Sequence, residues 1–285
     1  MNSGKKNKTR YFKIGGANMS NFYGLIGEKL GHSFSPVING LILKKINAEG
    51  TYNLFEIKKG NLKEAIQSLK ILGCSGVNVT IPYKIEVMNY LDEISEEAAK
   101  IGAVNTVAFC NGKLKGYNTD YFGFGLTLKK YKIDVKNKSA YILGTGGVSK
   151  AVSRYLMDNG IKSVTYVSRE ANGHSKDNTE IISYDELKRC RGDIIINCTP
   201  CGMYPAVDNC PVDRSTLEKF DTAVDLIYNP EYTLFLKLGM ELGLKTANGL
   251  YMLIAQNAAS QNVWRGIDVP LEVIDEVYKE GCRLL

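Results

Sequence analysis

The sequence predicts an α/β protein with two lobes: an N-terminal, mostly parallel α/β substrate domain and a Rossmann-like dinucleotide-binding domain. Short β-branched runs alternate with amphipathic helical patterns along the 285 residues, which is typical of parallel sheets covered by helices. A glycine turn at residues 144–147 stands between a strand pattern and a helix pattern, the context that a dinucleotide site requires. The last patterns, from Gly249 on, are helical, and we expect them to return to the first lobe.

The chain is long enough for two domains with substantial cores. We expect residues 19–118 and 249–285 to form the substrate-binding and catalytic domain, and residues 119–248 to form the dinucleotide-binding domain. Residues 1–18 are expected to be a disordered basic extension. Five basic side chains stand there before any acid appears, namely Lys5, Lys6, Lys8, Arg10 and Lys13.

The net charge of +6 is therefore concentrated at the N-terminus, and the rest of the chain carries only +1. A nearly neutral body argues against a nucleic-acid or membrane partner. The N-terminal extension has no apolar region of the signal-peptide kind, and no stretch approaches the ~18 apolar residues of a membrane-spanning helix.

Strand and helix patterns alternate through the first lobe. Strands are expected at residues 22–27, 52–57, 77–81, 107–109 and 114–117, and helices at 37–46, 62–69 and 95–100. Pro82 ends the third strand because it has no N–H to donate, and Pro36 suits the first turn of a helix. Asn111-Gly112 predicts a two-residue hairpin between the last two strands.

Three polar loops of this lobe can contact a ligand. Ser33 and Ser35 precede a helix, where hydroxyls and free N–H groups suit a carboxylate, although local sequence favours Ser35 as a simple N-cap. Lys84 follows the third strand and can present an ammonium to a polar ligand. The alternative is a solvated lysine that opens a surface helix. Asp120 stands at the start of a helix, which Asp120 or Thr119 could simply cap.

The glycine turn of the second lobe follows a strand pattern at residues 140–143 and precedes a helix pattern. Its backbone N–H groups can approach a pyrophosphate at the helix N-terminus. The turn consists of Gly144, Thr145, Gly146 and Gly147, and Ser149 takes the third glycine position of G-x-G-x-x-G. Further strands at residues 164–167, 193–197 and 223–227, with a helix at 234–242, complete a Rossmann-like set.

The strand at residues 164–167 ends in Ser168-Arg169-Glu170, which bears on the choice of dinucleotide. An NAD site usually has an acid at this strand end to bind the ribose 2′-hydroxyl, and Ser168 is not acidic. Arg169 can neutralise a 2′-phosphate, whereas Glu170 would repel it. The balance favours NADP, and NAD stays open as the alternative.

Seven scattered cysteines, an odd number, fit reduced thiols in a cytoplasm. Cys198 and Cys201 form a C-x-x-C that follows a strand and precedes Gly202, whereas a redox motif would open a helix. A zinc site would need two more ligands at suitable spacing, and His32 and His174 are the only histidines. We interpret the C-x-x-C as coincidental and predict no metal.

Eight blocks in family order make the chain resemble shikimate dehydrogenase, of the shikimate/quinate dehydrogenase family, from about Gly24 to Gln256. The blocks are Gly31-His-Ser33-Phe-Ser35-Pro36, Asn78-Val-Thr80-Ile-Pro82-Tyr-Lys84, Gly102-Ala-Val-Asn105-Thr106, Gly116-Tyr-Asn118-Thr119-Asp120, Gly144-Thr-Gly146-Gly147, Asn197-Cys-Thr199-Pro200-Cys-Gly202-Met203, Asp225-Leu-Ile-Tyr228-Asn-Pro230 and Gly249-Leu-Tyr-Met252-Leu-Ile-Ala-Gln256.

The resemblance implies a reversible NADPH-dependent reduction of 3-dehydroshikimate to shikimate, in the pathway to chorismate and the aromatic amino acids. It implies a catalytic pair, Lys84 and Asp120. The substrate-binding residues that it implies are Ser33, Ser35, Thr80, Asn105, Asp120, Tyr228 and Gln256. The implied cofactor-binding residues are Gly144, Thr145, Gly146, Gly147, Ser168, Arg169, Thr199 and Gly249. A cytoplasmic enzyme with a small-molecule substrate, monomeric or homodimeric, is expected.

Two departures from the family's sequence pattern leave alternative functions open. The family often has Asn-Arg-Thr where this chain has Ser168-Arg169-Glu170, and some relatives use NAD and accept quinate. An NAD(P)-linked quinate/shikimate dehydrogenase is therefore the nearest alternative, and Ser35 in place of threonine favours shikimate-type substrates only by analogy. A non-catalytic ligand sensor is the alternative of another class. Retention of both Lys84 and Asp120 argues against it, because a sensor has no need of a proton-transfer pair.

Overall fold

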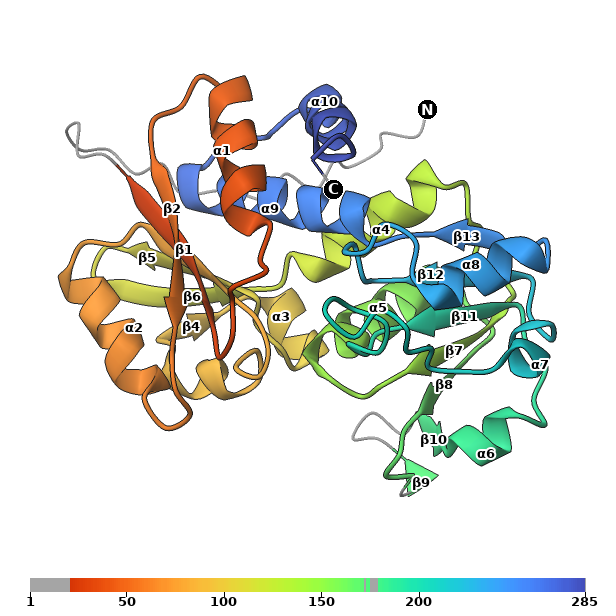
Figure 1. The fold of residues 1–285 in the computed structure, drawn as a ribbon. Coiled ribbons are helices and arrows are strands. Elements are labelled where there is room, and N and C mark those ends of the chain that lie inside the picture. The colour runs from red at the N-terminus through yellow and green to blue at the C-terminus, as the bar shows by residue number, and fades with distance from the viewer. Residues whose placement is uncertain (1–20, 172, 175–178, 285) are drawn as a thin grey trace, which may run out of the picture.

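Two α/β lobes make up the protein, as the computed structural model in Figure 1 shows, and helices α4 (Asp120–Lys130) and α9 (Leu250–Arg265) lie between them. The structure describes residues 21–171, 173–174 and 179–284. The predicted basic extension, residues 1–18, lies outside the described residues. Within the described part of the chain, no helix combines the length and the apolar character needed to cross a membrane.

The first lobe is built on a six-stranded sheet with the order β2-β1-β3-β5-β6-β4. Its strands are β1 (Phe22–Gly27), β2 (Thr51–Glu56), β3 (Gly76–Val79), β4 (Glu93–Ile94), β5 (Thr106–Cys110) and β6 (Lys113–Tyr117). Neighbouring strands run parallel except in the β3–β5 and β5–β6 pairs. The prediction of a mostly parallel sheet is confirmed, and the antiparallel β5–β6 pair is the hairpin expected at Asn111-Gly112.

Helices cover both faces of this sheet, because alternate residues of its strands are apolar on each side. On one face α2 (Leu62–Ile71) packs Leu62 and Ile66 into a core with Val77 of β3. On the other face Trp264 of α9 stacks on Tyr23 of β1, with ring centroids 4.7 Å apart. The remaining helices of the lobe are α1 (Ser35–Lys45), the 3₁₀ helix η1 (Glu86–Tyr90) and α3 (Glu96–Ile101).

The second lobe contains a seven-stranded sheet with the order β13-β12-β11-β7-β8-β10-β9. Its strands are β7 (Ser139–Leu143), β8 (Ser163–Val167), β9 (Gly173–His174), β10 (Glu180–Ile182), β11 (Ile194–Asn197), β12 (Thr222–Asp225) and β13 (Lys245–Ala247). All of its ladders are parallel except β9–β10. Counted from β7, the parallel strands follow the Rossmann order 3-2-1-4-5-6, so the sheet reverses its order between β7 and β11. Ligands bind at the carboxyl ends of strands at such a point.

The helices of the second lobe are α5 (Gly147–Asp158), α6 (Tyr184–Leu187), α7 (Arg214–Leu217) and α8 (Leu234–Glu241). The apolar core around β7 includes Ile142, Val152 of α5 and Phe124 of α4. Helix α4, which follows the last strand of the first lobe, therefore contributes directly to the core of the second lobe.

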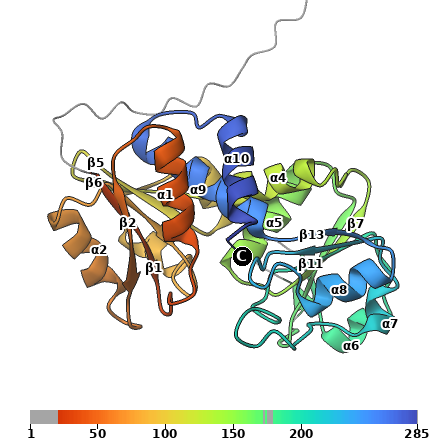
Figure 2. The same cartoon turned by 45° about the horizontal axis from the view of Figure 1, so that its top comes forward.

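The chain returns to the first lobe through α9 and α10 (Leu271–Gly281), as predicted. Figure 2 shows α1, α9 and α10 gathered along one side of the molecule. Gly123 lets α4 lie unusually close to α9, because a Cβ at this position would stand 2.8 Å from the Met252 carbonyl oxygen. The predicted boundaries at 118/119 and 248/249 fall at the starts of these two linking helices and stay predictions.

Candidate active site

Two adjoining cavities lie where strand ends of the two lobes face each other. The large cavity, about 770 Å³, is bordered by the glycine turn and by the ends of β8 and β11. The small cavity, about 220 Å³, extends from the same turn to α9. Residues that line both cavities are Ile81, Lys84, Gly146, Gly147, Cys198, Thr199 and Pro200. The two cavities therefore meet at Lys84 and the glycine turn.

Lys84 and Asp120 form a largely buried ion pair at this meeting point, with Nζ and Oδ2 2.6 Å apart. The Lys84 side chain is 12% exposed and that of Asp120 is 1% exposed. A lysine–carboxylate contact of this distance, with so little solvent exposure, is a charge-assisted hydrogen bond. This bond fixes the position of the ammonium. The structure brings the two predicted catalytic residues together.

Lys84 is also where the lobes touch. A Cβ placed on Gly147 of α5 would lie 2.9 Å from the Cβ of Lys84, so glycine is needed for this approach. The Lys84 carbonyl accepts a hydrogen bond of 2.8 Å from the Val104 N–H, which ties the loop to the start of β5. The alternative of a solvated lysine opening a surface helix is wrong, because this side chain is enclosed and η1 begins only at Glu86.

Asp120 is free to pair with Lys84 because another residue caps its helix. The Asn118 Oδ1 accepts the Tyr121 N–H at 3.3 Å at the start of α4. Thr119 occupies the N-cap position without a side-chain capping bond. The expectation that Asp120 or Thr119 simply caps this helix is therefore wrong, and Asn118 performs that task.

Asn105 and Gln256 belong to a buried polar network beside the small cavity. The Asn105 Nδ2 donates to Gln256 Oε1 at 2.9 Å and to Thr119 Oγ1 at 3.0 Å, while Asn105 Oδ1 accepts the Thr119 N–H at 2.7 Å. Gln256 uses its amide oxygen for this bond, and the residue lines the small cavity. Asn105 is 1% exposed, so it orients Gln256 from behind.

The loop before α1 meets the second lobe at Tyr228. The Phe34 N–H donates to the Tyr228 hydroxyl at 3.4 Å. Ser33 Oγ accepts the Ser35 N–H at 3.3 Å, and Phe34 holds the N-cap position of α1 without a side-chain bond. The interpretation of Ser35 as the N-cap is wrong, because Ser35 is already the first helical residue and Ser33 satisfies its N–H.

The predicted substrate residues are thus only partly gathered. Those that line the small cavity are Thr80, Asp120, Tyr228 and Gln256. Ser33, Ser35 and Asn105 do not line it. The predicted cofactor residue Gly249 lies at the small cavity, where a Cβ would stand only 2.0 Å from the Leu226 carbonyl oxygen.

The glycine turn has the geometry expected for a phosphate-binding loop. Gly144 has φ +95°, in the left-handed region that favours glycine, and α5 begins at Gly147 with Gly146 as its N-cap. Ser149 is fully buried and donates its hydroxyl to the Gly146 carbonyl at 2.6 Å. A serine therefore replaces the third glycine without loss of close packing, because its hydroxyl is satisfied within the turn.

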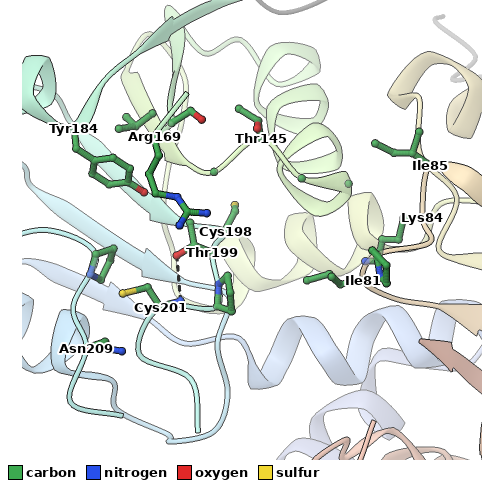
Figure 3. Close-up of a pocket in the computed structure, with 18 of the residues that line it drawn as sticks. Ile81, Lys84, Ile85, Thr145, Arg169, Tyr184, Cys198, Thr199, Cys201 and Asn209 are labelled. Atoms are coloured by element: carbon green, nitrogen blue, oxygen red, sulfur yellow. Dashed lines mark hydrogen bonds between the residues drawn. The ribbon is translucent and has the colours of Figure 1, made fainter. Parts of the chain in front are cut away.

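Ser168 and Arg169 stand at the end of β8 and line the large cavity with Thr145 and Thr199. Figure 3 shows the Arg169 guanidinium directed into this cavity. Within the described part of the chain, Arg169 pairs with no carboxylate, and Glu170 forms no ion pair with it. Glu170 therefore leaves the Arg169 guanidinium open to a ligand, and its expected repulsion of a 2′-phosphate stays a prediction.

A buried carboxylate links the loops after β11 and β12. Asp225 accepts hydrogen bonds from Asn197 Nδ2 (3.0 Å), the Ile227 N–H (3.1 Å) and the Thr233 hydroxyl (2.6 Å). Asn197 Oδ1 in turn accepts the Thr199 N–H at 3.0 Å and its hydroxyl at 2.6 Å. Burial raises the pKa of Asp225 to about 7, although its three hydrogen bonds act to lower it.

Cys198 and Cys201 line the large cavity as free thiols. Burial, with a smaller contribution from the Asp225 charge, raises the pKa of both thiols above the ordinary cysteine value. Protonated thiols are poor nucleophiles, which supports the interpretation of the C-x-x-C as coincidental. Among the residues that the structure describes, no three histidine, cysteine, aspartate or glutamate side chains gather to hold a metal ion.

Sequence reasoning missed three aromatic residues of the cavities. His32 and Tyr204 line the small cavity from opposite lobes, with ring centroids 4.9 Å apart at an angle of 74°. Tyr184 lines the large cavity near Arg169. Position within the quoted blocks could have indicated His32, which precedes Ser33. Tyr184 follows a three-residue strand, and no local pattern connects it with the site.

Comparisons with known proteins agree with this geometry. Residues 25–107 match the family model described as the shikimate dehydrogenase substrate binding domain. A protein of Clostridium beijerinckii named shikimate dehydrogenase (NADP(+)) is 47% identical over 260 residues, which are 90% of this chain and 96% of that protein.

Two solved structures extend the similarity over both lobes. A chorismate mutase/shikimate 5-dehydrogenase fusion protein from Clostridium acetobutylicum has a TM-score of 0.89 and 50% identity, covering 93% of this chain and 98% of that one. A shikimate 5-dehydrogenase from Thermus thermophilus, in complex with NADP(H) and shikimate, has a TM-score of 0.80 and 29% identity, covering 91% and 99%.

Proposed function

Because the chain belongs to the shikimate dehydrogenase family, we propose that Lys84 and Asp120 carry the proton transfer of a reversible 3-dehydroshikimate reduction. The chain is an NADP-dependent oxidoreductase that acts on a CH–OH group. One observation carries the proposed roles. The buried Lys84–Asp120 pair stands where a cavity lined by polar first-lobe residues meets the glycine turn of a Rossmann sheet.

The residues of the large cavity fit NADP. The turn at residues 144–147 suits the pyrophosphate, Arg169 is a cation without a partner among the described residues, and Thr199 is held by Asn197. Gly144, Thr145, Gly146, Gly147, Ser168, Arg169 and Thr199 would hold the cofactor, with Gly249 at the border of the small cavity. When bound, NADPH supplies a hydride to the ketone carbon of the substrate.

Lys84 supplies the proton that balances this transfer. Negative charge grows on the ketone oxygen as its carbon is reduced, and an ammonium within hydrogen-bond reach can protonate that oxygen. In the oxidative direction neutral Lys84 accepts the hydroxyl proton. Asp120 fixes the lysine in place through the 2.6 Å contact between Nζ and Oδ2.

The small cavity orients the substrate ring. Thr80, Asp120, Tyr228 and Gln256 line it, and Asn105 sets the orientation of the Gln256 amide. Ser33 and Ser35 stand on the loop that bonds to Tyr228, and we assign them to the substrate carboxylate. A closing movement of the lobes would bring this loop nearer to the cavity and exclude water.

Relatives named shikimate dehydrogenase (NADP(+)) do not favour the quinate and sensor alternatives. A cytoplasmic location fits the odd number of free cysteines and the proposed biosynthetic role in the route to the aromatic amino acids. Monomer and homodimer both stay compatible with a site that is complete within one chain.

One assay tests the proposed reaction. Purified protein is mixed with shikimate or quinate, each with NADP or NAD, and the absorbance of the reduced nicotinamide is followed. We expect the fastest reduction with shikimate and NADP. Faster reduction with quinate would change the substrate assignment, and no reduction in any of the four mixtures would favour the sensor.

A further inference from the structure

Arg169 lies at the end of the large cavity that is remote from Lys84, and no carboxylate of the described residues forms an ion pair with it. Lys84, the other cation lining this cavity, is already paired with Asp120. Within residues 21–171, 173–174 and 179–284, Arg169 has neither an ion pair nor a side-chain hydrogen bond. Its neighbour Ser168 is partly engaged, because the hydroxyl accepts the Glu170 N–H at 3.2 Å.

Sheet pairing places Tyr184 beside Arg169. Strands β8 and β10 are parallel, with Val167 opposite Ile182, and the Ser168 N–H extends the pairing by donating to the Ile182 carbonyl at 2.9 Å. Arg169 and Tyr184 each follow their paired strand end by two residues. Both residues therefore lie just beyond the ends of two neighbouring strands, Tyr184 as the first residue of α6, and both line the large cavity.

The position of Tyr184 is firmly set by its neighbours in the chain. Ser183 and Glu186 form a capping box in which Ser183 Oγ accepts the Glu186 N–H at 3.1 Å and Glu186 Oε2 accepts the Ser183 N–H at 2.7 Å. The Tyr184 ring is half-buried, and its hydroxyl has no hydrogen-bond partner among the described residues. In Figure 3 the hydroxyl end of the Tyr184 ring points toward the Arg169 side chain, on the same side of the cavity.

We propose that Tyr184 is a cofactor-specificity residue, whose hydroxyl donates the second hydrogen bond, beside Arg169, to the 2′-phosphate of NADP. This inference rests on the proposed function, since it deepens the cofactor site. A phosphate monoester offers three acceptor oxygens, so a guanidinium and a phenol that stand just beyond the ends of adjacent strands can bind it together. Burial raises the pKa of Tyr184, which keeps the phenol protonated and able to donate near neutral pH.

The proposal also accounts for the residues that follow β8. Glu170, the next residue along the chain from Arg169, carries a carboxylate that cannot donate a hydrogen bond to a phosphate. Tyr184 supplies a hydroxyl to the same cavity from the start of α6, just after the adjacent strand β10. It thereby adds a neutral donor beside Arg169 without a second positive charge.

The test compares the dissociation constants of NADP and NAD for Tyr184→Phe, measured by titration calorimetry on the full chain. Removal of one hydrogen bond to a charged group is expected to weaken NADP binding by about tenfold. NAD, which lacks the phosphate, is expected to bind as before. Tyr90→Phe, which removes a hydroxyl bonded to Glu86 in the first lobe, is the matched control and should change neither constant.

Two further variants separate the possible failures. Arg169→Ala should weaken NADP far more than NAD. If it does so while Tyr184→Phe binds NADP normally, Tyr184 has no phosphate role and the proposed function stands. If Arg169→Ala instead affects both cofactors equally, the 2′-phosphate site itself is misplaced. An equal loss of NADP and NAD binding in Tyr184→Ala, with Tyr184→Phe unchanged, would make Tyr184 an adenine-stacking residue and overturn the proposal.

Discussion

The two cavities that meet at Lys84 differ in how their polar groups are satisfied. Beside the small cavity, Lys84 is bonded to Asp120, and Gln256 is bonded to Asn105. At the far end of the large cavity, Arg169 and Tyr184 have no partner among the described residues. The reacting end is thus preorganised by internal hydrogen bonds, while the cofactor end is left for a ligand to complete.

This difference follows from the separate tasks of the reacting end and the cofactor end of the site. Groups that stabilise charge in a transition state act best when they need no rearrangement at the moment of reaction. Groups that bind a charged part of a cofactor gain most when no internal partner competes for them. Substitutions at the preorganised end should therefore affect turnover, and those at the open end should affect binding.

The largest effect is expected for Lys84→Ala. Loss of a general acid–base group should lower kcat by about 10²–10⁴-fold with a much smaller change in the KM for NADP. Steady-state kinetics with shikimate measure both constants. Lys113→Ala removes an exposed lysine paired with Glu93 and serves as the control with normal turnover. Near-normal kcat in Lys84→Ala would remove this lysine from the mechanism.

A smaller effect is expected for Gln256→Ala. The variant removes a side chain that lines the small cavity and leaves the Asn105 amide without one of its acceptors. The kcat/KM for shikimate should fall by roughly tenfold to a hundredfold, because a substrate bond and the orientation of a buried amide are lost together. Gln67→Ala, on the exposed side of α2, is the control. An unchanged kcat/KM would place the substrate away from α9.

The smallest expected effect is on the stability of the folded protein. It arises from Asp225, the carboxylate that links the loops after β11 and β12. The pKa of Asp225 is raised to about 7, above the value of about 3.9 in an unfolded chain. The folded protein then holds a proton that the unfolded chain has released, so the stabilisation is complete below about pH 4 and is lost as the pH rises through 7.

Asp225→Asn tests the predicted fall in stability with rising pH, because asparagine cannot ionise and keeps the shape of the side chain. The Tm of the natural protein minus that of the variant should be several degrees larger at pH 5 than at pH 8, since each kcal/mol shifts Tm by about 2–4 °C in a protein of this size. Thermal unfolding at both pH values measures the difference. A difference that stays constant with pH would mean that Asp225 remains ionised throughout.

Much of this architecture was predictable from local patterns. The glycine turn between β7 and α5, the hairpin at Asn111-Gly112 and the helical C-terminal return all depend on short-range conformational preferences, and all are present. Residues inside the ordered blocks, such as Lys84 and Asp120, were identified by resemblance, and the structure shows them in contact.

Local sequence was a poor guide to helix caps and to the partners of buried polar groups. Ser35 and Thr119 both looked like caps, but Ser33 and Asn118 provide the acceptor atoms. Ser35 is already helical, and the Thr119 hydroxyl is engaged with Asn105. Tyr184 could not be found either, because it reaches Arg169 only through the pairing of β8 with β10. Contacts between strands distant in sequence decide such positions.

The structure of a ternary complex with NADP and shikimate tests the central claim most directly. The measured quantity is the distance from Lys84 Nζ to the substrate hydroxyl that is oxidised. We predict hydrogen-bond distance, about 2.7–3.2 Å, with the nicotinamide approaching from the glycine-turn side. A substrate bound outside the small cavity, or a nicotinamide separated from it by the Lys84–Asp120 pair, would contradict the account.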